Sequence, residues 1–229
     1  MKALQHAFRS LGLLAACALA SSGAHAALSS FTSKAAFDAA IGALGAIQTV
    51  DFEANAAGDT FASGTGTGGL TFVYSIADPS TLQVSATFGT TSGSNYLGLD
   101  NADTAFYLGD SFTIDFNRTV HAVGLYVIAG NDAQAGDVQL SVTGGSVSNA
   151  AVADTLVSDG QAFWLGLVES DINLGFTSAS VSFLPDGDAF LAVTVDDITS
   201  GVIAVPEPET WALMLVGLGA LATLRRRAG

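Results

Sequence analysis

Two pairs of carboxylates, one early and one late in the central part of the chain, have the residue types and spacing of calcium ligands. Asp51 and Glu53 flank Phe52, and Asp196 is followed directly by Asp197. Calcium is held by about six to eight oxygens, which carboxylates and carbonyls at strand ends supply. On a strand, alternation would place Asp51 and Glu53 on one face and Phe52 on the other. The pattern predicts a calcium site, with solvated acids at turns and strand ends as the alternative.

Side chains suited to catalysis are few. His121 is the only histidine after residue 25, and any Ser-His-Asp triad would have to use it. It stands in an alternating β pattern, where a lone histidine is more often structural. Glu53, Glu169 and many aspartates could supply the two carboxylates of a secreted polysaccharide hydrolase, but no pair is marked by an aromatic cleft pattern. The sequence therefore predicts a body without enzymatic activity, and the hydrolase is the alternative.

The charge of the chain limits its partners. Residues 28–204 contain Lys34 and Arg118 as their only bases and 19 of the chain's 21 acids, so their formal charge is 2 − 19 = −17. Nucleic acids and anionic membrane surfaces need basic patches, so no nucleic acid partner is expected. Extracellular polysaccharide fits better, since aromatic rings form sugar platforms. Trp164 is the main candidate for a glycan contact, although its apolar neighbours also suit a core position.

The elements that must position these residues are mostly β-strands. Short runs of β-branched and aromatic residues alternate with turn residues, which is typical of a β-sandwich of the jelly-roll kind. This domain is assigned to residues 27–200. A helix is predicted over Ser33–Ala43, where alanines favour a helix and Phe37 and Ile41 form an apolar stripe. The predicted strands are Thr49–Phe52, Leu70–Ser75, Leu82–Phe88, Tyr96–Leu99, Ala105–Leu108, Ser111–Phe116, Val120–Ile128, Val138–Val142, Ala162–Leu167, Ile172–Phe176, Ser180–Leu184 and Leu191–Ile198.

Residues 1–26 have the parts of a secretory signal peptide: a basic start, an apolar stretch and a cleavage site of small residues. The order of these parts predicts export and removal of the segment. They are Lys2 with Arg9, then Leu11–Ala20, then Ala24, His25 and Ala26, with the mature protein starting at Ala27.

Cys17, the only cysteine of the chain, gives an alternative N-terminus. Leu14-Ala15-Ala16-Cys17 fits a bacterial lipobox, and cleavage before Cys17 would produce a lipoprotein. Cleavage after Ala26 instead leaves a mature protein without cysteine. Disulfides and thiolate metal sites are then excluded.

Residues 201–229 form a linker, an apolar segment and a basic end. The prolines of the linker fix φ and remove backbone donors, so this part should be extended and accessible. As a helix, residues 211–224 would span roughly 21 Å, less than the ~30 Å of a bilayer core, so we expect a transient membrane helix over about 210–224. The basic end should stay cytoplasmic, with the domain outside. The residues concerned are Val205, Pro206, Glu207 and Pro208, then Trp211 at the opposite interface, then Arg225, Arg226 and Arg227.

The order of these three parts resembles the PEP-CTERM sorting signal, which marks substrates of exosortases in Gram-negative bacteria that make extracellular polysaccharide. The resemblance covers residues 205–229. It implies delivery by the secretion machinery, transient anchoring in the inner membrane, and removal of the helix by an exosortase that recognises Val205–Pro208. The product would reach the cell surface or a biofilm matrix.

A looser resemblance concerns the body. Val50-Asp51-Phe52-Glu53, Phe163-x-Leu165-Gly166 and Val195-Asp196-Asp197-Ile198 are similar in kind and order to segments of lectin-like sandwich domains. In jelly-roll carbohydrate-binding modules, the first and last strands lie together and hold a structural calcium. The resemblance thus implies a glycan-binding or structural body. A permanently anchored, unprocessed adhesin-like module is the alternative.

Overall fold

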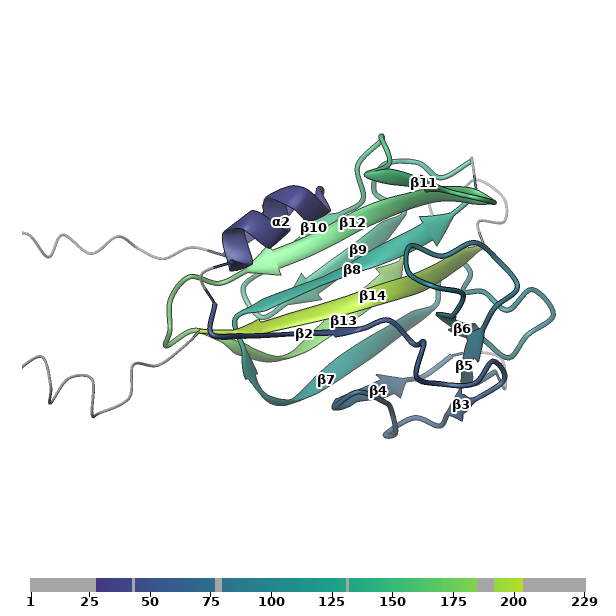
Figure 1. The fold of residues 1–229 in the computed structure, drawn as a ribbon, viewed down its shortest axis with the longest axis horizontal. Coiled ribbons are helices and arrows are strands. Elements are labelled where there is room, and N and C mark those ends of the chain that lie inside the picture. The colour runs from purple at the N-terminus through teal and green to yellow at the C-terminus, as the bar shows by residue number, and fades with distance from the viewer. Residues whose placement is uncertain (1–27, 43, 77–79, 131, 185–191, 204–229) are drawn as a thin grey trace, which may run out of the picture.

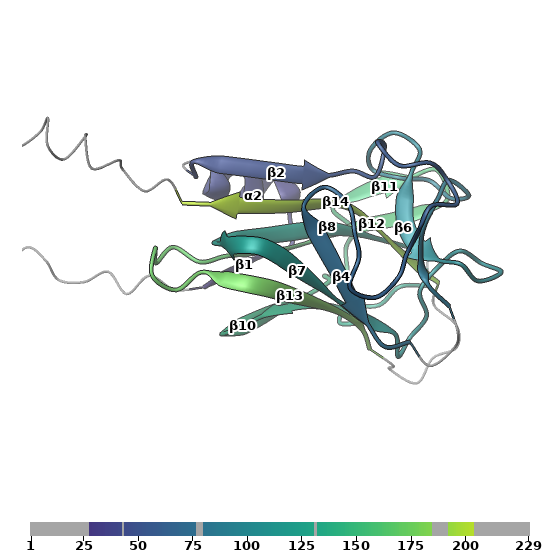
Figure 2. The ribbon, with the colours of Figure 1, turned by 90° about the horizontal axis from the view of Figure 1, so that it is seen from below.

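The computed structural model describes residues 28–42, 44–76, 80–130, 132–184 and 192–203. They form two antiparallel sheets packed face to face, with one helix against the outer face of the larger sheet (Figure 1; Figure 2 shows the layers edge-on). The predicted mainly-β sandwich with one helix is confirmed. The signal peptide and the apolar segment 210–224 lie outside the described residues, and no helix within these ranges is long and apolar enough to cross a membrane.

Nine strands form the larger sheet: β1 (Ser29–Phe31), β2 (Ala46–Val50), β3 (Thr60–Phe61), β5 (Leu82–Ser85), β6 (Tyr96–Leu99), β8 (Ala122–Ala129), β11 (Thr155–Val157), β12 (Gly160–Val168) and β14 (Val193–Val202). Their order is β1-β12-β8-β14-β6-β5-β3, while β11 pairs with β12 and β2 pairs with β14. The last strand, β14, therefore lies beside the early strand β2, whereas the first strand, β1, lies beside β12.

Five strands form the smaller sheet: β4 (Leu70–Tyr74), β7 (Ser111–Val120), β9 (Val138–Val142), β10 (Gly145–Ser148) and β13 (Phe176–Phe183). Their order is β10-β9-β13-β7-β4. Strands β9 and β10 are a hairpin in which Gly144 has φ of +102°. Such a tight turn needs a left-handed residue, and glycine adopts this conformation without strain.

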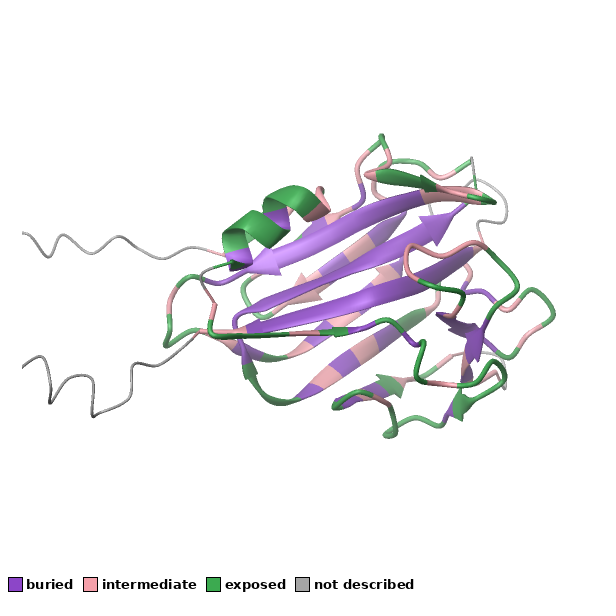
Figure 3. Ribbon diagram, viewed as in Figure 1, coloured by how far each residue is buried: buried purple, intermediate pink, exposed green. Residues whose placement is uncertain are grey.

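The two sheets bury one continuous core between them. In β7, Phe112, Ile114 and Phe116 are buried while the residues between them are partly exposed, as expected for a strand with one face on the core. Figure 3 shows these stripes on the smaller sheet, whereas β8, β12 and β14 are buried along nearly their whole length. The larger sheet is therefore covered on its outer face as well.

Helix α2 (Lys34–Ile41) provides part of that cover and confirms the predicted helix. Its buried residues Phe37 and Ile41 belong to a second apolar cluster with Trp164 on β12. Gly124 and Gly166 face each other across β8 and β12. A Cβ on Gly124 would lie 2.4 Å from the Trp164 ring, and one on Gly166 would lie 2.5 Å from the Phe37 ring. The two glycines make the space in which these rings pack.

Some predicted strand limits are wrong. The predicted strand Ser111–Phe116 continues to Val120 as β7, and the chain turns at His121, where it passes from the smaller to the larger sheet. Residues 105–108 contribute only an isolated bridge, between Phe106 and Val193, and the strand expected from Ile172 begins at Phe176. Strands β1, β3 and β11 were not predicted because two or three residues are too few to show alternation, and β10 was not predicted either.

The pairing of the strands defines the two ends of the sandwich. Cross-strand pairing places Ser29, Val168, Ala122 and Gly201 in one row. The chain therefore enters the sandwich and leaves it at the same end, called the exit end here. Ala129 pairs with Val193 at the opposite end, called the far end. The ten residues of β14 separate the two ends by about 30 Å.

Candidate functional site

Loop 90–95, which precedes β6, is held by two adjacent carboxylates of β14. Oδ2 of Asp196 accepts hydrogen bonds from the backbone N–H of Thr91 (3.0 Å) and of Ser92 (3.1 Å) and from the Thr91 hydroxyl (2.9 Å). The same hydroxyl lies 3.1 Å from Oδ2 of Asp197. Asp197 has φ of +52°, at the irregularity where the register between β14 and β8 shifts. This bulge lets two successive carboxylates approach one loop.

The carboxyl of Asp196 has a raised pKa. Its residue is fully buried. Burial, and next the negative charge of Asp197, raise its pKa from the usual 3.8 to about 6, against the opposing effect of the hydrogen bonds from Thr91 and Ser92. Burial disfavours the charged form, and a neighbouring like charge does the same. Asp196 therefore titrates under mildly acidic conditions.

Glu53 holds the other half of the same loop. Its Oε1 accepts the backbone N–H of Ser94 at 2.7 Å and of Asn95 at 2.6 Å. Gly93 has φ of +47°, and a Cβ there would lie 2.2 Å from Cδ of Glu53. The glutamate packs directly on the loop backbone. The carboxylates of Glu53, Asp196 and Asp197 thus act as acceptors for one surface loop.

The structure does not gather the four predicted calcium ligands around one point. Strand β2 ends at Val50, and Phe52 has φ of +60°, so Asp51 and Glu53 lie in a turn and not on one strand face. That part of the prediction is wrong, because Phe52 reaches the core through a left-handed turn. Within the described ranges, no three His, Cys, Asp or Glu side chains could hold a metal together. The pairing of Val50 with Ile198 nevertheless brings the early acids near the late ones.

Calcium binding stays a prediction with a clear test. A calcium ion bound by Asp196 and Asp197 together with loop carbonyls would offset the repulsion between the two carboxylates. At calcium concentrations about 100-fold above Kd, the melting temperature of the exported protein should rise by about 5–10 °C. Magnesium at the same concentration and the Asp197→Asn variant are the controls. The absence of both a thermal shift and a calorimetric signal would rule the site out.

Trp164 is a core residue and not an available sugar contact. It has no exposed surface. Its ring lies under α2, with ring centroids 5.1 Å from Phe37 and 4.9 Å from Tyr126, and Lys34 Nζ lies 5.3 Å from its centroid. A sugar cannot stack on a ring that is covered on all sides. The prediction of a glycan contact at Trp164 is corrected accordingly.

His121 and Glu169 have structural partners at the exit end. His121 is 5% exposed, with Nε2 at 3.0 Å from the Ile172 carbonyl oxygen and Nδ1 accepting the Ile203 backbone N–H at 3.5 Å. Glu169 accepts a hydrogen bond within its own turn, directly after β12. Glu53 lies beyond the opposite end of β2. These two glutamates do not face each other across one cleft, so they do not form a catalytic carboxylate pair with each other.

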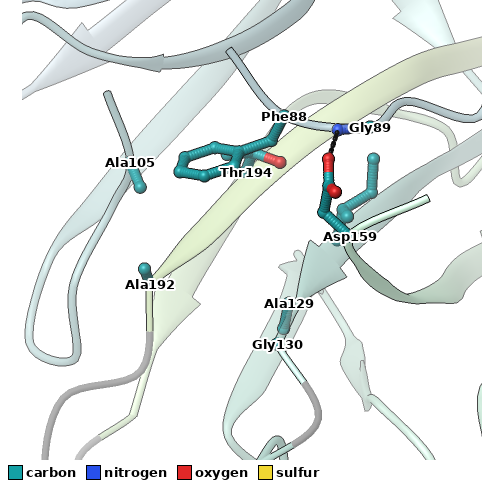
Figure 4. A pocket seen from close by; sticks show the side chains of 9 residues that line it. Phe88, Gly89, Ala105, Ala129, Gly130, Asp159, Ala192 and Thr194 are labelled. Atoms are coloured by element: carbon teal, nitrogen blue, oxygen red, sulfur yellow. Dashed lines mark hydrogen bonds between the residues drawn. The ribbon is translucent and has the colours of Figure 1, made fainter. Parts of the chain in front are cut away.

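A cavity of about 150 Å³ opens at the far end of the sandwich. It lies between the end of β8, the start of β14 and loops that contribute Phe88 and Asp159 (Figure 4). Phe88, Ile128 and three alanines form apolar walls, while Thr194 and Asp159 add polar side chains. The sequence does not indicate this cavity, because its residues come from separate segments and form no local motif. The only local signal was Phe88, an aromatic residue entering a stretch rich in Gly, Ser and Thr.

Comparison with known families concerns the C-terminus. Residues 204–228 match the model of the PEP-CTERM protein-sorting motif. The chain carries a PEP-CTERM sorting motif. This confirms the resemblance drawn from the linker, apolar segment and basic end, and it implies that the chain is exported and sorted in association with a membrane. No curated protein matches the whole sequence significantly.

Two solved structures are similar in part to this chain. One is the K2 cleaved adhesin domain of Lys-gingipain, with 15% identity and a TM-score of 0.40, covering 69% of this chain and 100% of that domain. The other is the CBM22-1 xylan-binding domain from Paenibacillus barcinonensis Xyn10C, with 18% identity and a TM-score of 0.31, covering 65% and 98%. At these values the likeness concerns the sandwich fold alone.

Proposed function

We propose that this PEP-CTERM protein is exported to the cell surface or extracellular matrix, where its sandwich binds polysaccharide without catalysing a reaction. The secretion machinery would deliver it to the inner membrane, and an exosortase would process it at Val205–Pro208. The observation that carries the proposal is the sorting motif, which starts at residue 204, just after β14 ends at Val202. The motif is thus joined to the domain by almost no additional chain.

The arrangement of the sandwich supports a display role. Because β14 ends at the exit end, that end faces the membrane while the C-terminal segment is attached. The far end, with the 150 Å³ cavity and loop 90–95, is about 30 Å away and faces outward. A ligand site placed there stays accessible before and after processing.

The charge of the body narrows the class of polysaccharide. With a formal charge of −17 over residues 28–204, the domain repels polyanions at low and moderate ionic strength. Uronic-acid and sulfated polymers should bind poorly. Neutral polysaccharides are the expected partners.

The sorting motif can be tested by replacing Pro206, Glu207 and Pro208 together with alanine. Wild-type protein should be found mainly in the surface or extracellular fraction without its C-terminal segment, whereas the triple variant should remain in the membrane at full length. Cell fractionation and immunoblotting with an antibody against the sandwich measure both properties. Glu209→Ala, which removes a charge just outside the motif, is the matched control and should behave as wild type. Equal distribution of the triple variant and the wild type would contradict exosortase processing.

The alternatives predict different results in the same material. A permanently anchored adhesin-like module would keep Arg225–Arg227 in the membrane fraction of wild-type cells. A secreted hydrolase would release reducing ends from polysaccharide and lose that activity in Glu53→Gln or Glu169→Gln. Our proposal predicts neither result.

A further inference from the structure

The far-end cavity contains a buried hydroxyl that the fold itself does not use. Thr194 is 3% exposed, and its Oγ1 is fully buried without a hydrogen-bond partner in the part of the chain that the structure describes. An unsatisfied buried hydroxyl costs about 1–3 kcal/mol. Valine has the same shape without this cost, and valine occupies the neighbouring positions 193 and 195 of β14. Thr194 is one of the residues that line the cavity, so a ligand bound there would supply the missing partner once the side chain rotates toward it.

Phe88 gives the cavity a fixed aromatic wall. Its side chain is 38% exposed, which is unusual for a phenylalanine, and its ring stacks on Tyr96 at 6.1 Å between centroids and 27° between planes. Tyr96 is fully buried, and its hydroxyl lies 2.6 Å from that of Thr104. The supporting ring is therefore held in place. An exposed aromatic face on a rigid base suits stacking against the C–H groups of a sugar ring.

Asp159 closes the rim from the opposite side. Its Oδ2 accepts the Gly89 backbone N–H at 3.0 Å and lies 3.1 Å from the Ser158 hydroxyl. A Cβ on Gly89 would lie 2.4 Å from the Ser158 oxygen, so the two loops are in direct contact. These contacts hold the two loops together at the rim (Figure 4). A mostly apolar cavity with a few fixed polar groups is the usual form of a small-molecule site.

The size and chemistry of the cavity specify its ligand class. A volume of about 150 Å³ accommodates a molecule of roughly benzene size, so one sugar ring enters at most in part and a polymer cannot pass through. The Asp159 carboxylate accepts sugar hydroxyls and repels anionic substituents. The side chains of Ile128 and the alanines cannot hydrogen-bond further sugar hydroxyls, but their apolar surface suits a methyl group.

We infer that the cavity formed by Phe88, Asp159 and Thr194 binds the terminal residue of a neutral glycan through a methyl-bearing edge, as found in a 6-deoxyhexose or an N-acetylhexosamine. Phe88 stacks on the ring, Thr194 hydrogen-bonds a polar atom beside the methyl group, and Asp159 accepts a ring hydroxyl. This inference rests on the proposed polysaccharide-binding function and names its site and specificity.

Calorimetry on the purified exported protein tests the inference, with methyl α-L-fucoside, methyl α-L-rhamnoside, N-acetylglucosamine and methyl α-glucoside as probes, and a neutral-glycan array in parallel. We expect one of the methyl-bearing sugars to bind and the glucoside to bind more weakly. Comparing the affinities for the fucoside and rhamnoside with that for N-acetylglucosamine shows whether the bound methyl group belongs to a 6-deoxyhexose or to an N-acetyl group. Equal affinity for the glucoside would overturn the methyl specificity.

Variants of cavity residues test whether the sugar binds in the cavity. Thr194→Val removes one hydrogen bond and should raise Kd about tenfold while leaving the melting temperature unchanged or higher. Phe88→Ala should raise Kd by a similar or larger factor, and Val152→Ala, at an exposed residue outside the cavity, is the matched control. If the wild type binds neutral glycans and Thr194→Val and Phe88→Ala bind equally well, the cavity assignment is wrong while the proposed function stands. If the wild type binds none of the sugars and no glycan on the array, both are wrong.

Discussion

Trp164→Ala is expected to destabilise the sandwich by about 3–5 kcal/mol, because the ring fills the space between α2 and the outer face of the larger sheet. Phe37 and Tyr126 lose their ring partner, and the slot left by Gly124 and Gly166 has no side chain that could fill it. The same change would lower the melting temperature by about 10 °C or more for a domain of this size. Thermal or urea unfolding measures the effect.

Leu156→Ala is the control for Trp164→Ala. Leu156 is 75% exposed on β11, so its truncation should change stability by less than about 0.5 kcal/mol. Sugar binding by folded Trp164→Ala should equal that of wild type at a temperature well below its transition. Preserved stability combined with lost binding would show instead that the Trp164 ring is a sugar contact.

Acidification is expected to stabilise the domain through Asp196. The folded-state pKa of about 6 lies above the usual 3.8, so the folded protein binds the proton more tightly than the unfolded chain. Stability therefore increases as pH falls from about 6 to about 4, and the ionised carboxyl lowers stability above this window. A shift of this size corresponds to on the order of 3 kcal/mol. Unfolding by urea at a series of pH values measures the slope.

Asp196→Asn isolates this contribution from the other acids. General charge repulsion in a body of formal charge −17 also weakens on acidification, and both proteins share that term. The wild type should gain more stability than Asp196→Asn between pH 7 and pH 4.5. Below pH 4, the free energies of unfolding of the two proteins should become similar. Parallel curves for the two proteins would show that Asp196 is not the titrating group.

The sandwich could be predicted because its long strands show their environment in sequence. Alternation in β7 and the helical spacing of Phe37 and Ile41 come from burial on one face, which local sequence records. The order of the strands could not be predicted, because β14 pairs with β8 and β2 through contacts between segments far apart in the chain. The left-handed conformation of Phe52 was also hidden, because nothing in its residue type demands it.

The candidate site was only partly predictable for a similar reason. Glu53, Asp196 and Asp197 were predicted as calcium ligands, and the structure shows their carboxylates accepting hydrogen bonds from a loop. A carboxylate that accepts backbone N–H groups has the same residue type as a calcium ligand. Thr194 in an alternating strand suggests an exposed residue, whereas the structure buries it at a cavity. The sequence around Trp164 suits both a core position and a sugar-binding platform, and only the position of α2 over the ring distinguishes these alternatives.

The mass of the intact protein from the surface or extracellular fraction tests the central claim most directly. In wild-type cells we predict a chain that begins at Ala27 and lacks the apolar segment 211–224 and Arg225–Arg227. In cells without the exosortase we predict the C-terminal segment still attached and the protein held in the membrane. A surface or extracellular protein that keeps Arg225–Arg227 in wild-type cells would contradict sorting by removal of this segment.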